Sequence, residues 1–72
     1  MKKIKKIKIR VNDKLKMINE NTNLSKLVDK LKIPLKKVAI ELNQEIIDKK
    51  KLGVKTLDKN DKIEIVHFIG GG

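Results

Sequence analysis

The stretch DKIEIVHFIGGG, residues 61–72, decides the fold because a strand pattern runs directly into three glycines. From residue 62 the side chains alternate between two faces, the first holding Ile63, Ile65, His67 and Ile69 and the second Glu64, Val66 and Phe68. A period of two predicts a strand, here over residues 62–69. Glycine loses the most freedom when it is ordered, so we expect Gly70, Gly71 and Gly72 to form a flexible tail.

The residues before this strand predict more extended structure. DKND at residues 58–61 is a turn, and VAIEL at residues 38–42 alternates as a second strand. After a turn at Asn43 and Gln44, residues 45–47 form a short extended piece. We expect residues 48–55 to be an irregular basic connection, with Leu57 as its one buried anchor.

One helix is predicted in the middle of the chain. Leu24, Leu27, Val28 and Leu31 recur at helical spacing and form one apolar face. Thr22 is the expected N-cap, with Asn21 and Asn23 as alternatives. Pro34 biases the residue before it away from helical angles and is expected to end the helix.

The chain begins with a predicted hairpin. Residues 3–11 alternate isoleucine and valine with basic residues, residues 12–14 (NDK) form a turn, and residues 15–18 are extended again. Hairpin, helix and further strands predict an α+β fold: a mixed sheet of four to five strands with one main helix packed on one face. We expect one domain, residues 1–69, followed by the tail, residues 70–72.

Composition limits the function classes. The 72 residues contain no cysteine and carry a net charge of +10, and all 19 basic residues except Arg10 are lysine. With one phenylalanine as the sole aromatic, a base-stacking surface is missing, so nucleic acid is not the expected partner. No apolar run approaches the roughly 20 residues of a membrane helix, and no signal peptide is recognisable. We expect a soluble, monomeric, cytoplasmic protein.

Enzyme chemistry is not expected. His67 is the only histidine and Ser25 the only serine, and no glycine-rich loop joins a strand to a helix. We therefore expect no bound cofactor and no metal. The unusual group is the carboxylate of Gly72, which would become reactive if ATP converted it to an acyl adenylate. Glycines before it would let the chain enter a narrow channel.

Fold and tail together resemble a known family. KIKIRVND, TNLSKLVDKL, VAIELNQEII and especially DKIEIVHFIGGG are similar to the ubiquitin-like β-grasp sulfur carriers, most closely to the ThiS family of thiazole formation in thiamine biosynthesis. The resemblance covers essentially the whole chain. It implies a β-grasp fold and a role as a protein sulfur carrier.

The resemblance also implies partners and site residues. An adenylating enzyme related to ubiquitin-activating enzymes would use ATP and Mg to adenylate Gly72. Sulfur, commonly from a cysteine desulfurase, would convert it to a thiocarboxylate for thiazole synthase. Gly70 and Gly71 would thread the tail into both enzymes.

Partner docking is expected on the sheet face that the helix leaves uncovered. Val66 and Phe68 should lie there beside the tail, next to Ile69, because exposed apolar groups often mark partner surfaces.

Three alternatives stay open: a carrier of the molybdopterin-synthase small-subunit type, a tRNA-thiolation carrier or ubiquitin-like modifier, and a small basic nucleic-acid-binding module.

Overall fold

The computed structural model describes residues 4–68, so Ile69 and the expected tail, Gly70 to Gly72, lie outside the described residues. The elements, in chain order, are β1 (Lys6–Val11), β2 (Lys14–Asn19), α1 (Leu24–Lys30), η1 (Leu35–Lys37), β3 (Val38–Leu42), β4 (Glu45–Ile46), η2 (Lys49–Val54) and β5 (Lys62–His67), where η denotes a 3-10 helix. The described part of β5 thus ends at His67, two residues before the predicted end of the strand.

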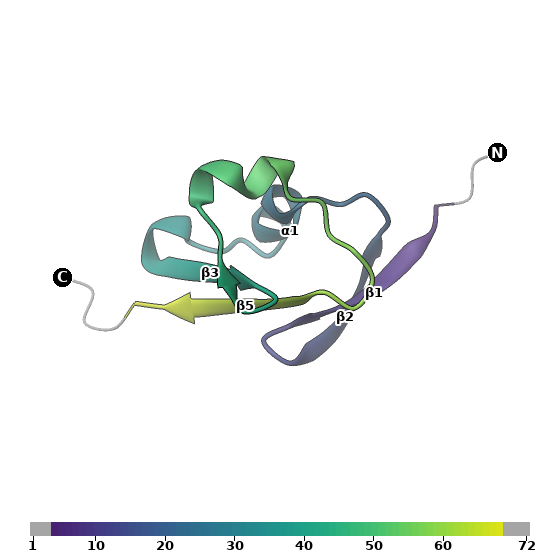
Figure 1. Cartoon of the computed structure of the whole chain (residues 1–72), viewed down its shortest axis with the longest axis horizontal. Helices are drawn as coiled ribbons and strands as arrows, with labels where there is room; N and C mark the ends of the chain where they lie inside the picture. Colours follow the sequence, from purple (N-terminus) through teal and green to yellow (C-terminus); the bar gives the residue numbers. More distant parts are fainter. Residues whose placement is uncertain (1–3, 69–72) are drawn as a thin grey trace.

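The strands form one mixed sheet. Their order across the sheet is β2-β1-β5-β3-β4. β1 and β5 are parallel, whereas the other neighbouring pairs are antiparallel. α1 and η2 lie together on one side of this sheet (Figure 1). The predicted α+β architecture, a mixed sheet with one main helix on one face, is confirmed.

Both hairpins turn through two residues with positive φ. Asn12 and Asp13 have φ of 48° and 66°, and Asn43 and Gln44 have φ of 51° and 71°. Two such residues make a type I′ turn, whose twist matches that of the flanking strands. Both predicted turns are confirmed, and they set the register of the two hairpins, since Val11 lies opposite Lys14 and Leu42 opposite Glu45.

The two turn asparagines also hold the central strand. Asn12 Oδ1 accepts the N–H of Ile65 at 2.7 Å, and its Nδ2 donates to the Ile65 carbonyl at 3.4 Å. Asn43 Oδ1 accepts the N–H of Lys62 at 2.9 Å, and its Nδ2 donates to Asp61 at 3.0 Å. The first residue of each turn therefore binds β5 from one of its two sides.

The N-cap of α1 is Asn23 and not Thr22. Asn23 Oδ1 accepts the N–H of Lys26 at 2.8 Å, the bond that defines an N-cap. Thr22 instead donates its hydroxyl hydrogen to the carbonyl of Asn19, one turn earlier. The expectation for Thr22 is wrong because its side chain stabilises the loop before the helix, and the alternative Asn23 is correct.

α1 ends at Lys30, before the residue that precedes Pro34, so the proline does not end the helix as predicted. Lys32 has a φ of 56°, and its N–H donates to the carbonyl of Asp29, while the N–H of Ile33 donates to that of Val28. This pair of bonds is a Schellman motif, which satisfies the last carbonyls of a helix. The predicted helical face is otherwise confirmed, with Leu24, Leu27 and Val28 buried.

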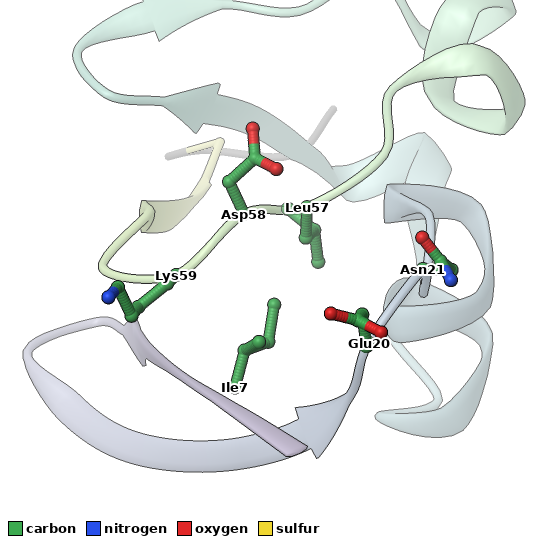
Figure 2. Close-up of a pocket in the computed structure, with 6 residues that line it drawn as sticks. All are labelled: Ile7, Glu20, Asn21, Leu57, Asp58 and Lys59. Atoms are coloured by element: carbon green, nitrogen blue, oxygen red, sulfur yellow. The ribbon is translucent and has the colours of Figure 1, made fainter. Parts of the chain in front are cut away.

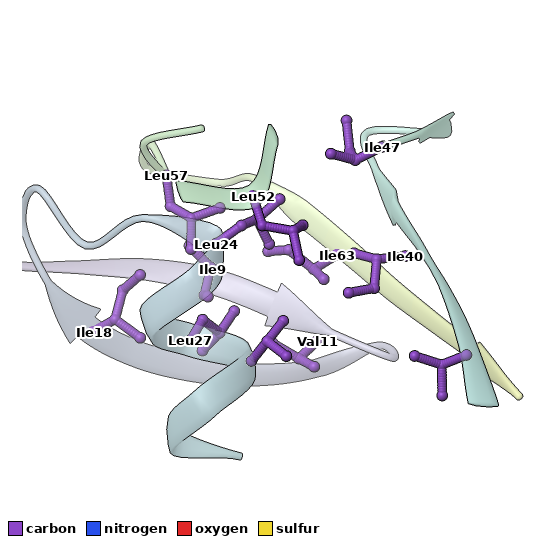
Figure 3. Packing of buried hydrophobic residues seen from close by; sticks show 12 residues of the cluster. Ile9, Val11, Ile18, Leu24, Leu27, Ile40, Ile47, Leu52, Leu57 and Ile63 are labelled. Atoms are coloured by element: carbon purple, nitrogen blue, oxygen red, sulfur yellow. The ribbon is translucent and has the colours of Figure 1, made fainter. Parts of the chain in front are cut away.

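The core lies between the sheet and the helical layer (Figure 3). Its buried residues are Ile9, Val11, Ile18, Leu24, Leu27, Val28, Val38, Ile40, Ile47, Leu52, Leu57 and Ile63. Two expectations for residues 48–57 are corrected here. Residues 49–54 form the 3-10 helix η2, with Asp48 as its cap, and Leu52 is a second buried anchor beside Leu57.

The sheet has a second face that the helices leave uncovered, here called the open face. Strand alternation and register place on it Lys6, Lys8, Arg10, Leu15, Met17, Asn19, Ala39, Glu41, Ile46, Lys62, Glu64 and Val66. None of these described residues is buried. The open face is therefore accessible to other molecules.

Candidate functional site: the open face and the end of β5

Two exposed aliphatic side chains lie on the open face on either side of β3. Val66 is 46% exposed and lies directly opposite Ala39 of β3. Ile46 is 75% exposed and lies opposite Glu41 at the other side of β3. An aliphatic side chain as exposed as that of Ile46 contributes little to the stability of the fold. Its exposure on this face is typical of a surface that contacts a partner.

Two carboxylates border this apolar group. Glu41 and Glu64 are direct cross-strand neighbours on β3 and β5, and like charges in such positions repel. Lys62 compensates part of the charge, with its ammonium nitrogen 3.4 Å from a Glu64 oxygen. In a chain of net charge +10, this face thus carries a local acidic pair next to exposed aliphatic side chains.

Phe68 follows the last residue of β5 and is held by two contacts. Its N–H donates to the carbonyl of Lys37 at 2.9 Å, which continues the β3–β5 pairing by one step. Its ring centroid is 5.4 Å from the ammonium nitrogen of Lys49, the first residue of η2, a distance suited to a cation–π contact. Lys49 also donates to the carbonyl of Leu35. The ring nevertheless remains 56% exposed.

The predicted site residues divide into two groups. Val66 and Phe68 are both exposed near the end of β5, as expected, although a lysine from the helical layer covers part of the Phe68 ring. Ile69 and the three terminal glycines lie outside the described residues. Ile46 was missed, yet the two-residue turn before it fixes its parity, so the sequence did contain a signal for it.

A hollow lies elsewhere on the described surface, between β1 and the loop before β5. It measures about 350 Å³ and is lined by Ile7, Glu20, Asn21, Leu57, Asp58 and Lys59. Ile7 and Leu57 point into it from opposite sides (Figure 2). Its six lining residues supply two carboxylates, one amide and one ammonium group, with no hydroxyl, thiol or imidazole among them.

The described residues meet the requirements of neither a three-ligand metal site nor a membrane-spanning helix. Across residues 4–68, no three His, Cys, Asp or Glu side chains are grouped closely enough to hold a metal ion. None of the helices in that part of the chain has the length and apolar character to cross a membrane. What the described surface does present is the open face, with exposed aliphatic side chains on β4 and β5.

Comparison with protein families gives one match over nearly the whole chain. The sequence profile of the ThiS family matches residues 5–72, which includes all five strands, α1 and the three final glycines.

Two curated proteins are also similar to this chain. It is 36% identical over 66 residues to a thiazole synthase of Magnetococcus marinus and 33% identical over 66 residues to one of Paramagnetospirillum magneticum. In both cases the match covers 92% of this chain but 20% of the relative, so the chain spans about a fifth of the length of these relatives.

Solved structures are similar in fold and in sequence. The crystal structure of the thiamine biosynthesis protein ThiS of Geobacter metallireducens superposes with a TM-score of 0.81 at 29% identity, covering 92% of this chain and 100% of that one. A solution structure of a thiamine biosynthesis protein from the same organism gives a TM-score of 0.71 at 29% identity, covering 92% and 88% of the two chains.

Proposed function

The chain belongs to the ThiS family, and we propose that it is a protein sulfur carrier of thiamine biosynthesis whose reactive group is the carboxylate of Gly72. The observation that carries the proposal is the extent of the family match, which continues from the first strand through the final glycine. The ThiS crystal structure supports it, because its whole length superposes on this chain.

The proposed chemistry has two steps at Gly72. In the first, a carboxylate oxygen attacks the α-phosphorus of ATP and releases pyrophosphate, which leaves an acyl adenylate. In the second, hydrosulfide attacks the carbonyl carbon and AMP departs, so that the carboxylate has exchanged one oxygen for sulfur. Where the sulfur arrives as a persulfide, the attack forms an acyl disulfide, and a thiol then cleaves its S–S bond, which releases the thiocarboxylate and leaves the thiol in a disulfide with the donor. Absence of a Cβ at Gly72 and Gly71 leaves the carbonyl carbon unobstructed for both attacks.

The proposed partners follow from these steps. An adenylating enzyme would bind ATP and Mg, a cysteine desulfurase or another donor would supply sulfur, and a thiazole synthase would receive it. The two relatives named thiazole synthase support the last of these, because each contains a segment similar to this chain. We place the protein in the cytoplasm, where ATP is available, as a monomer with no bound cofactor.

We assign docking of the enzymes to the open face. Val66 and Ile46 supply exposed aliphatic surface, and the exposed Phe68 ring lies next in sequence after the end of β5. Ile69 remains a proposed docking residue from the sequence alone. Glu41 and Glu64 would attract basic residues of the partner, and their mutual repulsion would be relieved in the complex. A surface that precedes the tail by a few residues would fix the distance over which Gly72 is delivered.

The test is the intact mass of the protein after incubation with ATP, a ThiS-adenylating enzyme and a sulfur source. The protein should gain the mass of one oxygen-to-sulfur exchange, and fragmentation should place it on Gly72. Gly71→Val should block the gain while leaving the fold unchanged, because a β-branched side chain obstructs the channel and restricts the backbone. An alanine added after Gly72 should block it as well.

Two further arms make the result decisive. Val66→Glu should slow sulfur loading by weakening docking, whereas Lys59→Glu, in the loop at the other end of β5 from Val66, should not. Addition of thiazole synthase, or separately of molybdopterin synthase large subunit, distinguishes the pathways that share this chemistry. Sulfur loading of the protein with the added alanine, without trimming, would refute the role of Gly72.

A further inference from the structure

β2 is a long strand at an open edge of the sheet. It has six residues and, among the strands of residues 4–68, one neighbour, β1, whereas β4 at the opposite edge has two residues. An exposed edge strand offers its outward backbone groups to another extended chain. The length of β2 makes it the edge of this sheet where a further strand could pair.

The hydrogen bonds of β1 show which groups of β2 point outward. Lys8 accepts the N–H of Asn60, and the N–H groups of Arg10 and Asn12 donate to Asp61 and Ile63, so these β1 residues face β5. The residues between them face β2, where Ile9 pairs with Lys16 and Ile7 with Ile18. In an antiparallel pair, the backbone N–H and C=O groups of the residues between the hydrogen-bonded pairs point away from the partner strand. The N–H and C=O groups of Leu15 and Met17 therefore face the open edge.

A hollow runs along this edge between the strand and the helix. It measures about 300 Å³ and is lined by Leu15, Lys16, Met17, Ile18, Leu27, Lys30 and Leu31, and we call it the β2–α1 groove. Ile18 and Leu27, which belong to its floor, are shown in Figure 3 on the strand and the helix. The groove thus combines an apolar floor with an unpaired strand along one side.

Cations border the groove. Lys16 on β2 and Lys30 on α1 line it, and Lys14 begins the same strand. Leu15 and Met17, each 57% exposed, extend the apolar surface around the strand onto the open face. A second copy of this chain would bring Lys14 and Lys16 against the same lysines, and such like-charge contacts disfavour pairing. The charge is complementary to an acidic segment.

We propose that the β2–α1 groove binds an extended peptide segment of a partner protein, apolar at alternate positions and acidic at its ends, which adds to β2 as a sixth strand. The backbone of Leu15 and Met17 would pair with it, as in other cases of strand addition. Alternate apolar side chains would cover Ile18, Leu27 and Leu31. The acidic end next to the start of β2 would meet Lys14, and the long side chains of Lys16 and Lys30 would reach it from the groove. This surface lies at the other edge of the sheet from β4 and Ile46 and does not depend on the proposed sulfur transfer.

The probe is the synthetic peptide acetyl-Asp-Glu-Val-Thr-Ile-Thr-Val-Glu-Asp-amide, titrated into the ¹⁵N-labelled chain at low salt. The largest amide shift changes should fall on Leu15, Met17 and the groove residues of α1. A peptide with the same centre but lysines at both ends should bind at least roughly tenfold more weakly, because its charges would face Lys16 and Lys30.

Two variants test the two halves of the proposal. Lys16→Glu combined with Lys30→Glu should weaken peptide binding roughly tenfold, whereas Lys36→Glu combined with Lys59→Glu, which changes the net charge equally, should have less than about a twofold effect. Met17→Pro removes an outward N–H from an edge position, where proline is tolerated, and should abolish binding with the remaining spectrum preserved.

Several outcomes would overturn the proposal. These are shift changes centred on the open face near Val66, equal weakening by both pairs of charge reversals, and no binding at millimolar peptide. Concentration-dependent self-association through β2, measured by sedimentation, would assign the groove to a second copy instead. If Met17→Pro fails to fold, the charge-reversal pairs still decide, since all four lysines are exposed.

Discussion

Lys32 holds a backbone conformation that is costly for a residue with a Cβ. Its φ of 56° closes the Schellman motif of α1, a position where glycine is usual. The other non-glycine residues with positive φ are Asn12, Asp13, Asn21, Asn43, Gln44 and Asn60, all with short polar or amide side chains. Lys32 is thus the residue where this fold retains local strain.

We expect Lys32→Gly to stabilise the protein. Relief of the left-handed strain exceeds the added freedom of the unfolded chain, which leaves a net gain of about 0.5–1 kcal/mol in the free energy of unfolding. Urea denaturation measures it. Lys30→Gly, two residues earlier and inside α1, is the matched control and should destabilise by about 1 kcal/mol. A lower urea midpoint for Lys32→Gly would show that the lysine side chain makes an unrecognised contact.

Lys49 differs from the two lysines that follow it, because it alone among them contacts an aromatic ring in the described structure. We expect Lys49→Gln to lower stability by about 0.5–1 kcal/mol and to shift the ring proton resonances of Phe68, since a cation over an exposed ring contributes about this much. At roughly 0.15 M salt, where repulsion among exposed lysines is largely screened, Lys50→Gln combined with Lys51→Gln should change neither quantity appreciably. Equal effects of both changes would mean that the contact with Phe68 does not persist in solution.

The two hairpin turns stabilise the central strand as well as reversing the chain. Asn12→Gly keeps the positive φ but removes both side-chain hydrogen bonds to Ile65, so we expect a loss of about 1–2 kcal/mol. Asp13→Gly, at the next turn position, should be neutral or stabilising, because Asn-Gly suits a type I′ turn. Thermal unfolding gives the two values, and faster amide exchange at Ile65 in Asn12→Gly alone would locate the effect. A similar loss of stability in Asn12→Gly and Asp13→Gly would mean that the effect comes from the turn backbone and not from the side-chain hydrogen bonds of Asn12.

Patterns of period two and of helical spacing predicted most of these elements. β3 matches the predicted residues 38–42, and α1 buries the predicted apolar face, because short-range periodicity reflects which side chains enter the core. The N-cap and η2 were not predicted correctly. Thr22 and Asn23 are both good caps, and tertiary contacts decide between them. Leu52 is buried because η2 packs against α1. The lysine-rich sequence of residues 48–55 has no periodic pattern that would predict this packing.

The candidate site was predictable to the extent that strand parity determines it. Val66 follows from the alternation of β5, and its exposure is confirmed. Phe68 lies beyond the last strand residue, where alternation no longer fixes direction, and the contact with Lys49 joins segments nineteen positions apart in sequence. The β2–α1 groove was not predicted, because an open edge is a property of strand order, and strand order follows from long-range pairing.

The whole molecule carries far more positive charge than its carboxylates can neutralise. Its net charge is +10, and the one ion pair found among residues 4–68 joins Lys62 and Glu64, both partly exposed. An exposed pair of this kind contributes at most about 1 kcal/mol. Stability therefore depends on the apolar core and the backbone ladders, against a self-repulsion that folding increases by bringing the lysines closer together.

We expect the free energy of unfolding to rise with ionic strength. Going from 0.01 M to 1 M salt shortens the screening length from about 30 Å to about 3 Å, so repulsion between lysines across the sheet is lost. Urea unfolding in increasing sodium chloride measures the effect. The triple variant Lys50→Gln, Lys51→Gln and Lys59→Gln should be more stable at low salt and respond less to added salt, because it has fewer charges to screen. If wild type and variant respond with the same slope, the stabilisation comes from a general effect of salt on apolar burial. In that case repulsion between the lysines lowers the free energy of unfolding only slightly. The excess of lysine would then have to be explained by binding to partners and not by stability.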